Sequence, residues 1–187
     1  MTATERATPS RCGGARCSSI CKTAHMNLAE LDLPTGTFSL RRAVASDVGS
    51  IVALLADDQL RAAVESTTIE ARRPYDLAFE AIDADPAQIL IVAVSPEDDV
   101  VATMQLTFIP GLARAGALRM QIEAVRVHSD IRGNGLGGAM ITWAIAEGRS
   151  RGARLIQLTS DQARLAAHRF YARLGFEASH VGFKLAL

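Results

Sequence analysis

The chain has 187 residues, 49% of them hydrophobic, and its 20 Lys and Arg balance its 20 Asp and Glu. This length suits one domain with a substantial core. The balanced charge gives no reason to expect nucleic-acid binding. The sequence contains no apolar run near the roughly 20 residues of a membrane span and no signal-peptide core, so we expect a cytoplasmic protein that binds no membrane.

The first 35 residues differ from the rest, because they are rich in Thr, Ser, Ala and Gly and show no hydrophobic period. We therefore predict a disordered arm over 1–35 and a single domain over 36–187. The arm contains Cys12, Cys17 and Cys21, whose spacing does not match the Cys-x-x-Cys of zinc sites. We expect no metal site, and Met26 is an alternative start for the folded part.

From residue 36 onward, hydrophobic periodicity predicts strands that alternate with helices. The predicted strands are 38–42, 88–94, 100–109, 117–127, 155–158 and one or two in 176–187. The predicted helices are one capped by Ser46, then 59–65, 75–82, 135–150 and a last one capped by Asp161 and ended by Gly175. This order indicates an α/β fold with a mixed sheet flanked by helices.

A glycine-rich turn lies between the strand 117–127 and the helix 135–150. Gly133, Gly135, Gly137 and Gly138 give four glycines in six positions. Glycine leaves backbone N–H groups uncovered, and such groups at the start of a helix bind anions, phosphate above all. The strand, turn and helix together therefore predict a site for a phosphorylated ligand.

The same glycines also match the dinucleotide fingerprint G-x-G-x-x-G, with Asp161 roughly 20 residues downstream. However, five residues, His128 to Arg132, separate the strand from the first glycine, where that fold has none. The unit also begins too late in the chain for two complete halves. A dinucleotide-binding oxidoreductase thus remains the weaker alternative.

Two motifs resemble the GCN5-related N-acetyltransferase (GNAT) family. Its pyrophosphate loop, Gln/Arg-x-x-Gly-x-Gly/Ala, is matched by Arg132, Gly135 and Gly137, and its Tyr-x-x-x-Gly-Phe is matched by Tyr171, Gly175 and Phe176. The resemblance implies a mixed sheet of about six to seven strands with about four helices, and acetyl-CoA as co-substrate.

The resemblance also implies which residues contact acetyl-CoA. Val125 and Val127 would bind the pantetheine arm through their main chain. The pyrophosphate would lie against the loop Arg132, Gly133, Asn134, Gly135, Leu136, Gly137 and Gly138. Arg164 occupies a position where the family often has Asn, and we expect it, or Ser160, to replace that contact.

Acyl transfer to an amine needs a base for the amine and a donor for the leaving thiolate. The family assigns the second role to the tyrosine that matches Tyr171, and a phenol can donate a hydrogen bond or a proton there. For the base, we favour Glu123, a lone carboxylate in an apolar strand. Simple alternation places it on the same face as Gln121, Val125 and Val127, half-buried. His128 or a water chain could act instead, and Glu123 could simply be salt-bridged.

We therefore predict an acetyl-CoA-dependent N-acetyltransferase that acetylates a primary amine, expected to be a small molecule, by direct attack in a ternary complex. A non-catalytic acetyl-CoA sensor is the alternative from another class. The segment from Ala167 to Tyr171, with Ser179 and His180, also resembles aminoalkylphosphonate-type members of the family, which is too short a match to fix the acceptor. The family resemblance further allows a homodimer.

Overall fold

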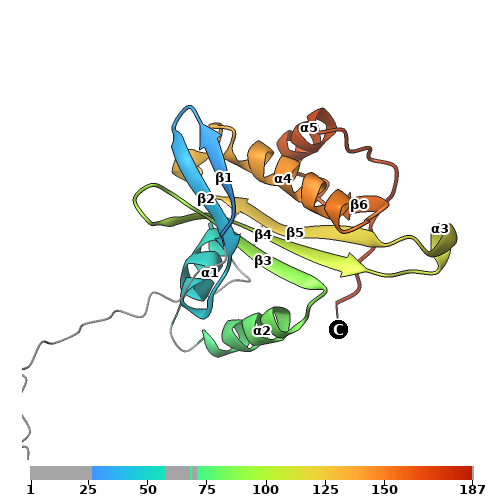
Figure 1. Ribbon diagram of the computed structural model, residues 1–187, viewed down its shortest axis with the longest axis horizontal. Coiled ribbons are helices and arrows are strands. Elements are labelled where there is room, and N and C mark those ends of the chain that lie inside the picture. The colour runs from blue at the N-terminus through green and yellow to red at the C-terminus, as the bar shows by residue number, and fades with distance from the viewer. Residues whose placement is uncertain (1–26, 58–67, 69–70, 187) are drawn as a thin grey trace, which may run out of the picture.

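A computed structural model describes residues 27–57, 68 and 71–186, and it contains one six-stranded sheet (Figure 1). The strands follow chain order: β1 Asn27–Leu33, β2 Gly36–Arg42, β3 Gln88–Val94, β4 Val100–Ile109, β5 Arg119–Val127 and β6 Leu155–Leu158. All neighbours are antiparallel except β5 and β6, which are parallel. The predicted mixed sheet with flanking helices is confirmed.

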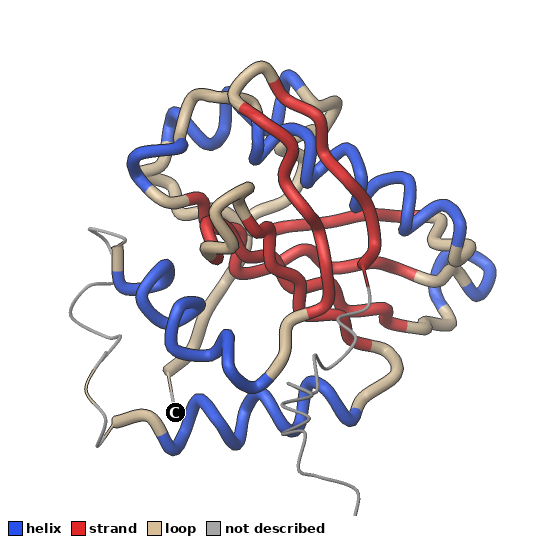
Figure 2. The backbone as a smooth tube through the Cα atoms, turned by 60° about the vertical axis from the view of Figure 1, so that its left-hand side comes forward, coloured by secondary structure: helices blue, strands red, loops and turns tan. Residues whose placement is uncertain are grey.

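Helices cover both faces of this sheet. They are α1 Val48–Ala56, α2 Arg73–Ala84, the single turn α3 Ala113–Gly116, α4 Leu136–Ser150 and α5 Leu165–Arg173. Figures 1 and 2 show α4 and α5 on one face and α1 and α2 on the other. The predicted helix over 59–65 lies outside the described residues.

The prediction that residues 1–35 form one disordered arm is wrong for its last part, because 27–33 form β1. Leu31 and Leu33 point inward while Glu30 and Asp32 are exposed, which is the two-residue period of a strand with one buried face. This strand pairs with β2 along its length. The folded domain thus includes Asn27–Leu33, and the three cysteines lie outside the described residues.

The main core lies between the sheet and α4. It contains fully buried side chains from β3, β4 and β5, and Met140, Ile141 and Ala144 from α4. Gly148 lets α4 approach the sheet, because a Cβ there would lie 3.0 Å from the terminal methyl of Met120. A smaller cluster under α1 and α2 packs Ile51 against β3.

The C-terminal segment is the second departure from the sequence prediction. Residues 174–186 form no strand, although 176–187 were expected to add one or two. Val181, Phe183 and Leu185 do alternate as in a strand, yet they are 69%, 93% and 85% exposed. An extended segment becomes a strand only when a sheet edge accepts its hydrogen bonds, and this segment has no such edge in the chain as described.

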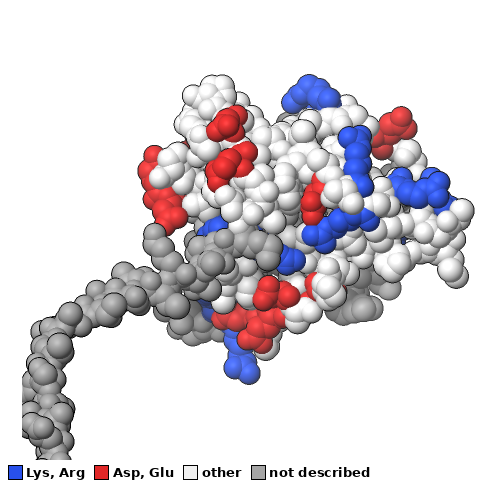
Figure 3. Space-filling view, viewed as in Figure 1, with Lys and Arg blue, Asp and Glu red and all other residues white. Residues whose placement is uncertain are grey.

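Charged side chains of both signs are spread over the surface in Figure 3, with acidic groups over β1 and near α2. Within the described part of the chain, none of the helices has the length and apolar character needed to span a bilayer.

Candidate active site

The two halves of β5 are paired differently. Arg119 to Ile122 pair with β4 on one side and with Leu155–Leu158 of β6 on the other. From Glu123 to Val127 the strand keeps β4 as its neighbour but has no partner on the β6 side among the described residues. The second half of β5 therefore presents an open backbone edge, beside the loop that leads into α4.

A β-bulge marks the boundary between these halves. Gln105 pairs with Glu123 and Thr103 pairs with Arg126, so two steps along β4 match three along β5. Ala124 absorbs the extra residue with φ of 52°, in the left-handed region that costs energy for a side chain with a Cβ. Such strain is concentrated at functional sites.

The bulge corrects the predicted orientation of Glu123. An extra residue reverses the alternation, so Val125 and Val127 pack against the main core, on the opposite face from Gln121 and Glu123. Glu123 is also exposed rather than half-buried. Alternation alone could not show this, because the position of a bulge depends on the neighbouring strand.

The glycine loop has the backbone features of an anion site. Gly133 and Gly135 have φ of 88° and 90°, and Gly135 is the N-cap of the 15-residue helix α4. The N–H groups of Gly133, Gly135, Leu136, Gly137 and Gly138 donate no hydrogen bond to any described residue. Uncommitted N–H groups at the positive end of a helix favour a negatively charged ligand.

Glycine occupies positions of this loop for two different reasons. Positive φ requires glycine at 133 and 135, as noted above. At Gly138 the backbone is ordinary, and an added Cβ would meet nothing within 4 Å. Packing within the described part of the chain therefore does not require this glycine, and the open space leaves room for a ligand at the helix terminus.

Arg132 is held in place by the protein itself. Its Nε donates to the carbonyl of Val127 at 2.9 Å, and its Nη2 pairs with Oδ2 of Asp57 at 2.8 Å. Val125 similarly accepts a hydrogen bond at 2.8 Å from Nη1 of Arg126. The predicted pantetheine-binding carbonyls thus already contact two arginines, and each retains a second lone pair for a ligand.

Tyr171 lies on α5 with its ring half-buried and in edge contact with Phe170 and Phe176. Burial raises the pKa of Tyr171 above its ordinary value of 10.0, and the positive charges of Arg126 and Arg164 oppose this rise. The preceding residue, Phe170, lies near the end of β5, because a Cβ added at Gly137 would be 3.8 Å from Phe170 and 3.5 Å from Val127. A phenol in this state stays protonated at neutral pH and can donate a hydrogen bond.

The structure brings some of the predicted site residues together. The loop follows the open half of β5 directly, and Tyr171 and Arg164 are close enough to each other for the charge of Arg164 to lower the pKa of the phenol. His128 is exposed at the end of β5, where its Nδ1 accepts a hydrogen bond from the N–H of Asp130. Sequence reasoning missed Asp57, because its contact with Arg132 of the loop spans 75 positions along the chain.

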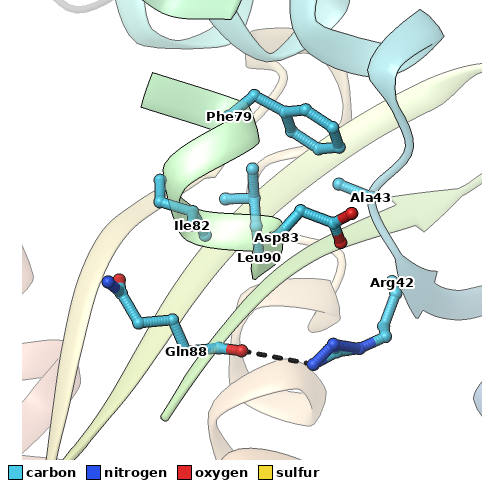
Figure 4. A pocket seen from close by; sticks show the side chains of 7 residues that line it. All are labelled: Arg42, Ala43, Phe79, Ile82, Asp83, Gln88 and Leu90. Carbon is cyan, nitrogen blue, oxygen red and sulfur yellow. Dashed lines mark hydrogen bonds between the residues drawn. The ribbon is translucent and has the colours of Figure 1, made fainter. Parts of the chain in front are cut away.

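A shallow hollow elsewhere is a separate feature. It lies between α2 and β3 and is lined by Arg42, Ala43, Phe79, Ile82, Asp83, Gln88 and Leu90 (Figure 4). Two of these residues are joined by a hydrogen bond, in which an Arg42 guanidinium nitrogen donates to the main-chain oxygen of Gln88 at 3.2 Å. None of the loop residues lines this hollow, so it is distinct from the candidate site.

The chain belongs to the acetyltransferase (GNAT) family, whose model matches residues 52–176. It is 39% identical over 67 residues to the aminoalkylphosphonate N-acetyltransferase of Salmonella typhimurium, a stretch that covers 36% of this chain and 44% of that protein. It is also 39% identical over 61 residues to an uncharacterized N-acetyltransferase of Methanocaldococcus jannaschii, which covers 33% of this chain and 27% of that protein. The chain thus spans less than half the length of these two curated relatives.

One solved structure is similar over most of its length. A transcriptional regulator from Bacillus halodurans is 41% identical, with a TM-score of 0.77, and the match covers 80% of this chain and 99% of that chain. Acetyl-CoA is the acetyl donor of the GNAT family. Membership of this family leaves the nicotinamide-dependent alternative without support.

Proposed function

We propose that this protein is an acetyl-CoA-dependent N-acetyltransferase that acetylates a primary amine on a small molecule. The observation that carries the proposal is the set of N–H groups of Gly133 and of residues 135–138 that donate to no described residue, next to the open edge of β5. A diphosphate fits the first feature and a pantetheine arm fits the second. Family membership supports acetyl transfer as the reaction.

Acetyl-CoA supplies the activated thioester, and residues of the chain accept the proton of the amine and stabilise the leaving thiolate. In the proposed reaction, the amine nitrogen bonds to the acetyl carbon and the carbon–sulfur bond breaks. Glu123 accepts the proton that the amine loses, directly or through water. Tyr171 donates a hydrogen bond to the leaving thiolate, a role that the raised pKa of this phenol supports.

The acceptor is proposed only as a class. The best-supported candidate is an amine that carries a phosphonate, because the relative matched over 67 residues bears that name. An amino-sugar, an amino acid and a protein lysine are the competing acceptors.

The test is release of CoA thiol from acetyl-CoA with 2-aminoethylphosphonate, glucosamine 6-phosphate, a free amino acid and a lysine peptide. We expect turnover with at least one small amine and none with matched alcohols. If no amine is acetylated although acetyl-CoA raises the melting temperature, the enzyme proposal fails.

That last outcome would support a second candidate, a non-catalytic acetyl-CoA sensor. The similarity to a protein described as a transcriptional regulator favours this candidate over other non-enzymatic functions. In a sensor, Tyr171→Phe would leave the affinity for acetyl-CoA unchanged.

We also propose a homodimer, supported by the exposed apolar side chains of Val181, Phe183 and Leu185. Light scattering on the full chain and on Phe183→Asp tests this. A wild-type mass equal to one chain at micromolar concentration would refute it.

A further inference from the structure

Polar side chains of three neighbouring strands form a row on the sheet face that carries α1 and α2. Gln88 lies on β3, Gln105 on β4 and Glu123 on β5. Gln105 and Glu123 are directly opposite each other across the β4–β5 ladder, whereas Gln88 lies diagonal to Gln105. Both glutamines are half-buried, and the row ends at the exposed Glu123, beside the bulge.

Asp85 fixes the orientation of the first amide. Its Oδ2 accepts a hydrogen bond from Nε2 of Gln88 at 3.2 Å, and its Oδ1 accepts from the N–H of Ala87 at 2.8 Å. A carboxylate only accepts hydrogen bonds, so Gln88 must direct its nitrogen toward Asp85. Figure 4 shows the Gln88 side chain leading away from its own main-chain oxygen and from Arg42.

The second amide is then oriented by the first. Oε1 of Gln88 accepts from Nε2 of Gln105 at 2.6 Å and from the hydroxyl of Thr107 at 3.4 Å. Nε2 of Gln105 is therefore directed toward β3. Its Oε1 accepts no hydrogen bond from any residue that the structure describes, and it cannot exchange places with Nε2 without losing the bond to Gln88.

Two acceptors are consequently left side by side on neighbouring strands. One is Oε1 of Gln105 and the other is the carboxylate of its cross-strand partner Glu123. Directly opposite residues have Cβ atoms about 5 Å apart, so one small group can contact both side chains. A group with several donors and a positive charge satisfies this pair, and an alkylammonium has three donors.

We propose that Gln105 and Glu123 together bind the ammonium group of the acceptor, and that Asp85 and Gln88 hold Gln105 in the orientation that accepts. This inference rests on the proposed function. It adds Gln105 to Glu123, the proposed base, as a second residue that contacts the ammonium group. Gln105 keeps the nitrogen in place while Glu123 takes its proton. Asp85 and Gln88 are positioning residues that do not touch the substrate.

The decisive variant is Gln105→Leu, which keeps the size of the side chain and removes the acceptor. With the best amine of the panel above, we expect the KM for the amine to rise about tenfold while the KM for acetyl-CoA changes less than twofold. Gln105→Glu keeps an acceptor and is expected to hold the amine KM within about threefold of wild type. Asp85→Asn frees Gln88 to turn, and we expect a rise of about threefold.

Gln157→Leu is the matched control. Gln157 is a half-buried glutamine on the same sheet, and its Nε2 donates to Gln121 at 2.5 Å rather than to the row. We expect its amine KM to stay within twofold of wild type. Equal effects of Gln105→Leu and Gln157→Leu, or an amine KM unchanged by Gln105→Leu, would overturn the inference.

A binding measurement separates this inference from the proposed function. The same amines are titrated calorimetrically into the protein saturated with CoA, which needs no turnover. Binding by wild type that weakens about tenfold in Gln105→Leu supports the ammonium site, even if acetylation is absent and the enzyme proposal has failed. Failure of every amine to bind wild type would overturn the site whatever the acetylation assay shows.

Discussion

The two halves of β5 belong to one strand but do different work. The first half, Arg119 to Ile122, is paired on both sides, and its Met120 and Ile122 are fully buried. The second half, Glu123 to Val127, follows a bulge and keeps one backbone edge open. The comparison shows how one strand of nine residues can combine a buried, doubly paired half with a half whose backbone edge is open. Substitutions on either side of Ala124 test whether the first half of β5 contributes mainly to stability and the second mainly to ligand binding.

The largest effect on stability is expected in the paired half. Met120→Ala removes a side chain with no exposed surface and leaves a cavity beside Gly148, which we expect to cost about 2–5 kcal/mol in the free energy of unfolding. Acetyl-CoA affinity of the folded protein should stay within about twofold of wild type. Val125→Ala, half-buried in the open half, is expected to cost about 1 kcal/mol. Denaturant unfolding of both variants checks the difference, and equal losses would contradict it.

The largest effect on binding is expected in the loop beside the open half. Gly138→Glu places a carboxylate at the helix terminus, where an added side chain finds open space, and should weaken acetyl-CoA binding about 100-fold. Gly138→Gln is the control of equal size, and we expect it to lose about tenfold less. Calorimetric titration measures both. Identical losses would show that bulk, and not charge, blocks the site.

The next effect concerns the rate. Tyr171→Phe keeps the ring contacts with Phe170 and Phe176 and removes the donor, so kcat should fall about 10- to 100-fold while the KM for acetyl-CoA changes little. Steady-state kinetics at saturating amine provide the measurement. A variant with wild-type kcat would remove Tyr171 from the mechanism.

The same substitution predicts a pH effect on stability. Burial raises the pKa of Tyr171 in the folded protein above 10.0, so the unfolded chain releases this proton first as the pH rises. The contribution of Tyr171 to stability is complete below pH 10 and is lost as pH rises through the folded pKa. Unfolding free energies of wild type should therefore fall more steeply above pH 10 than those of Tyr171→Phe. Parallel curves would contradict the raised pKa.

The smallest effect is expected at the ion pair that holds the loop arginine. Asp57→Asn removes the carboxylate 2.8 Å from Arg132. Because both side chains are about half exposed, the free energy of unfolding should change by less than about 1 kcal/mol. Losing a negative charge beside the anion site should lower the KM for acetyl-CoA about twofold, and Asp130→Asn, which is not paired with Arg132, is the control. A raised KM would mean that Asp57 orients Arg132 for binding.

The sequence by itself determined most of the sheet, the family and the place of the loop. Alternating and helical periods are local properties, and they located β2, β3, β4, β6 and α4 within one or two residues. The positive φ at Gly133 and Gly135 is also local, because only glycine adopts it without cost. Leu31 and Leu33 carried the pattern of β1 as well, but the composition of the neighbouring arm concealed it.

Only the tertiary structure determined which way the side chains of the open half of β5 point and which distant segments of the chain meet near it. The bulge at Ala124 turned Glu123 away from the face shared by Val125 and Val127, and that reversal is set by the pairing with β4. The contact of Asp57 with Arg132 joins segments distant in the chain, and the orientation of Gln105 depends on a neighbouring strand. The tail from Val181 to Leu185 has a strand pattern without a strand, because pattern supplies side-chain alternation and only a neighbouring edge supplies hydrogen bonds.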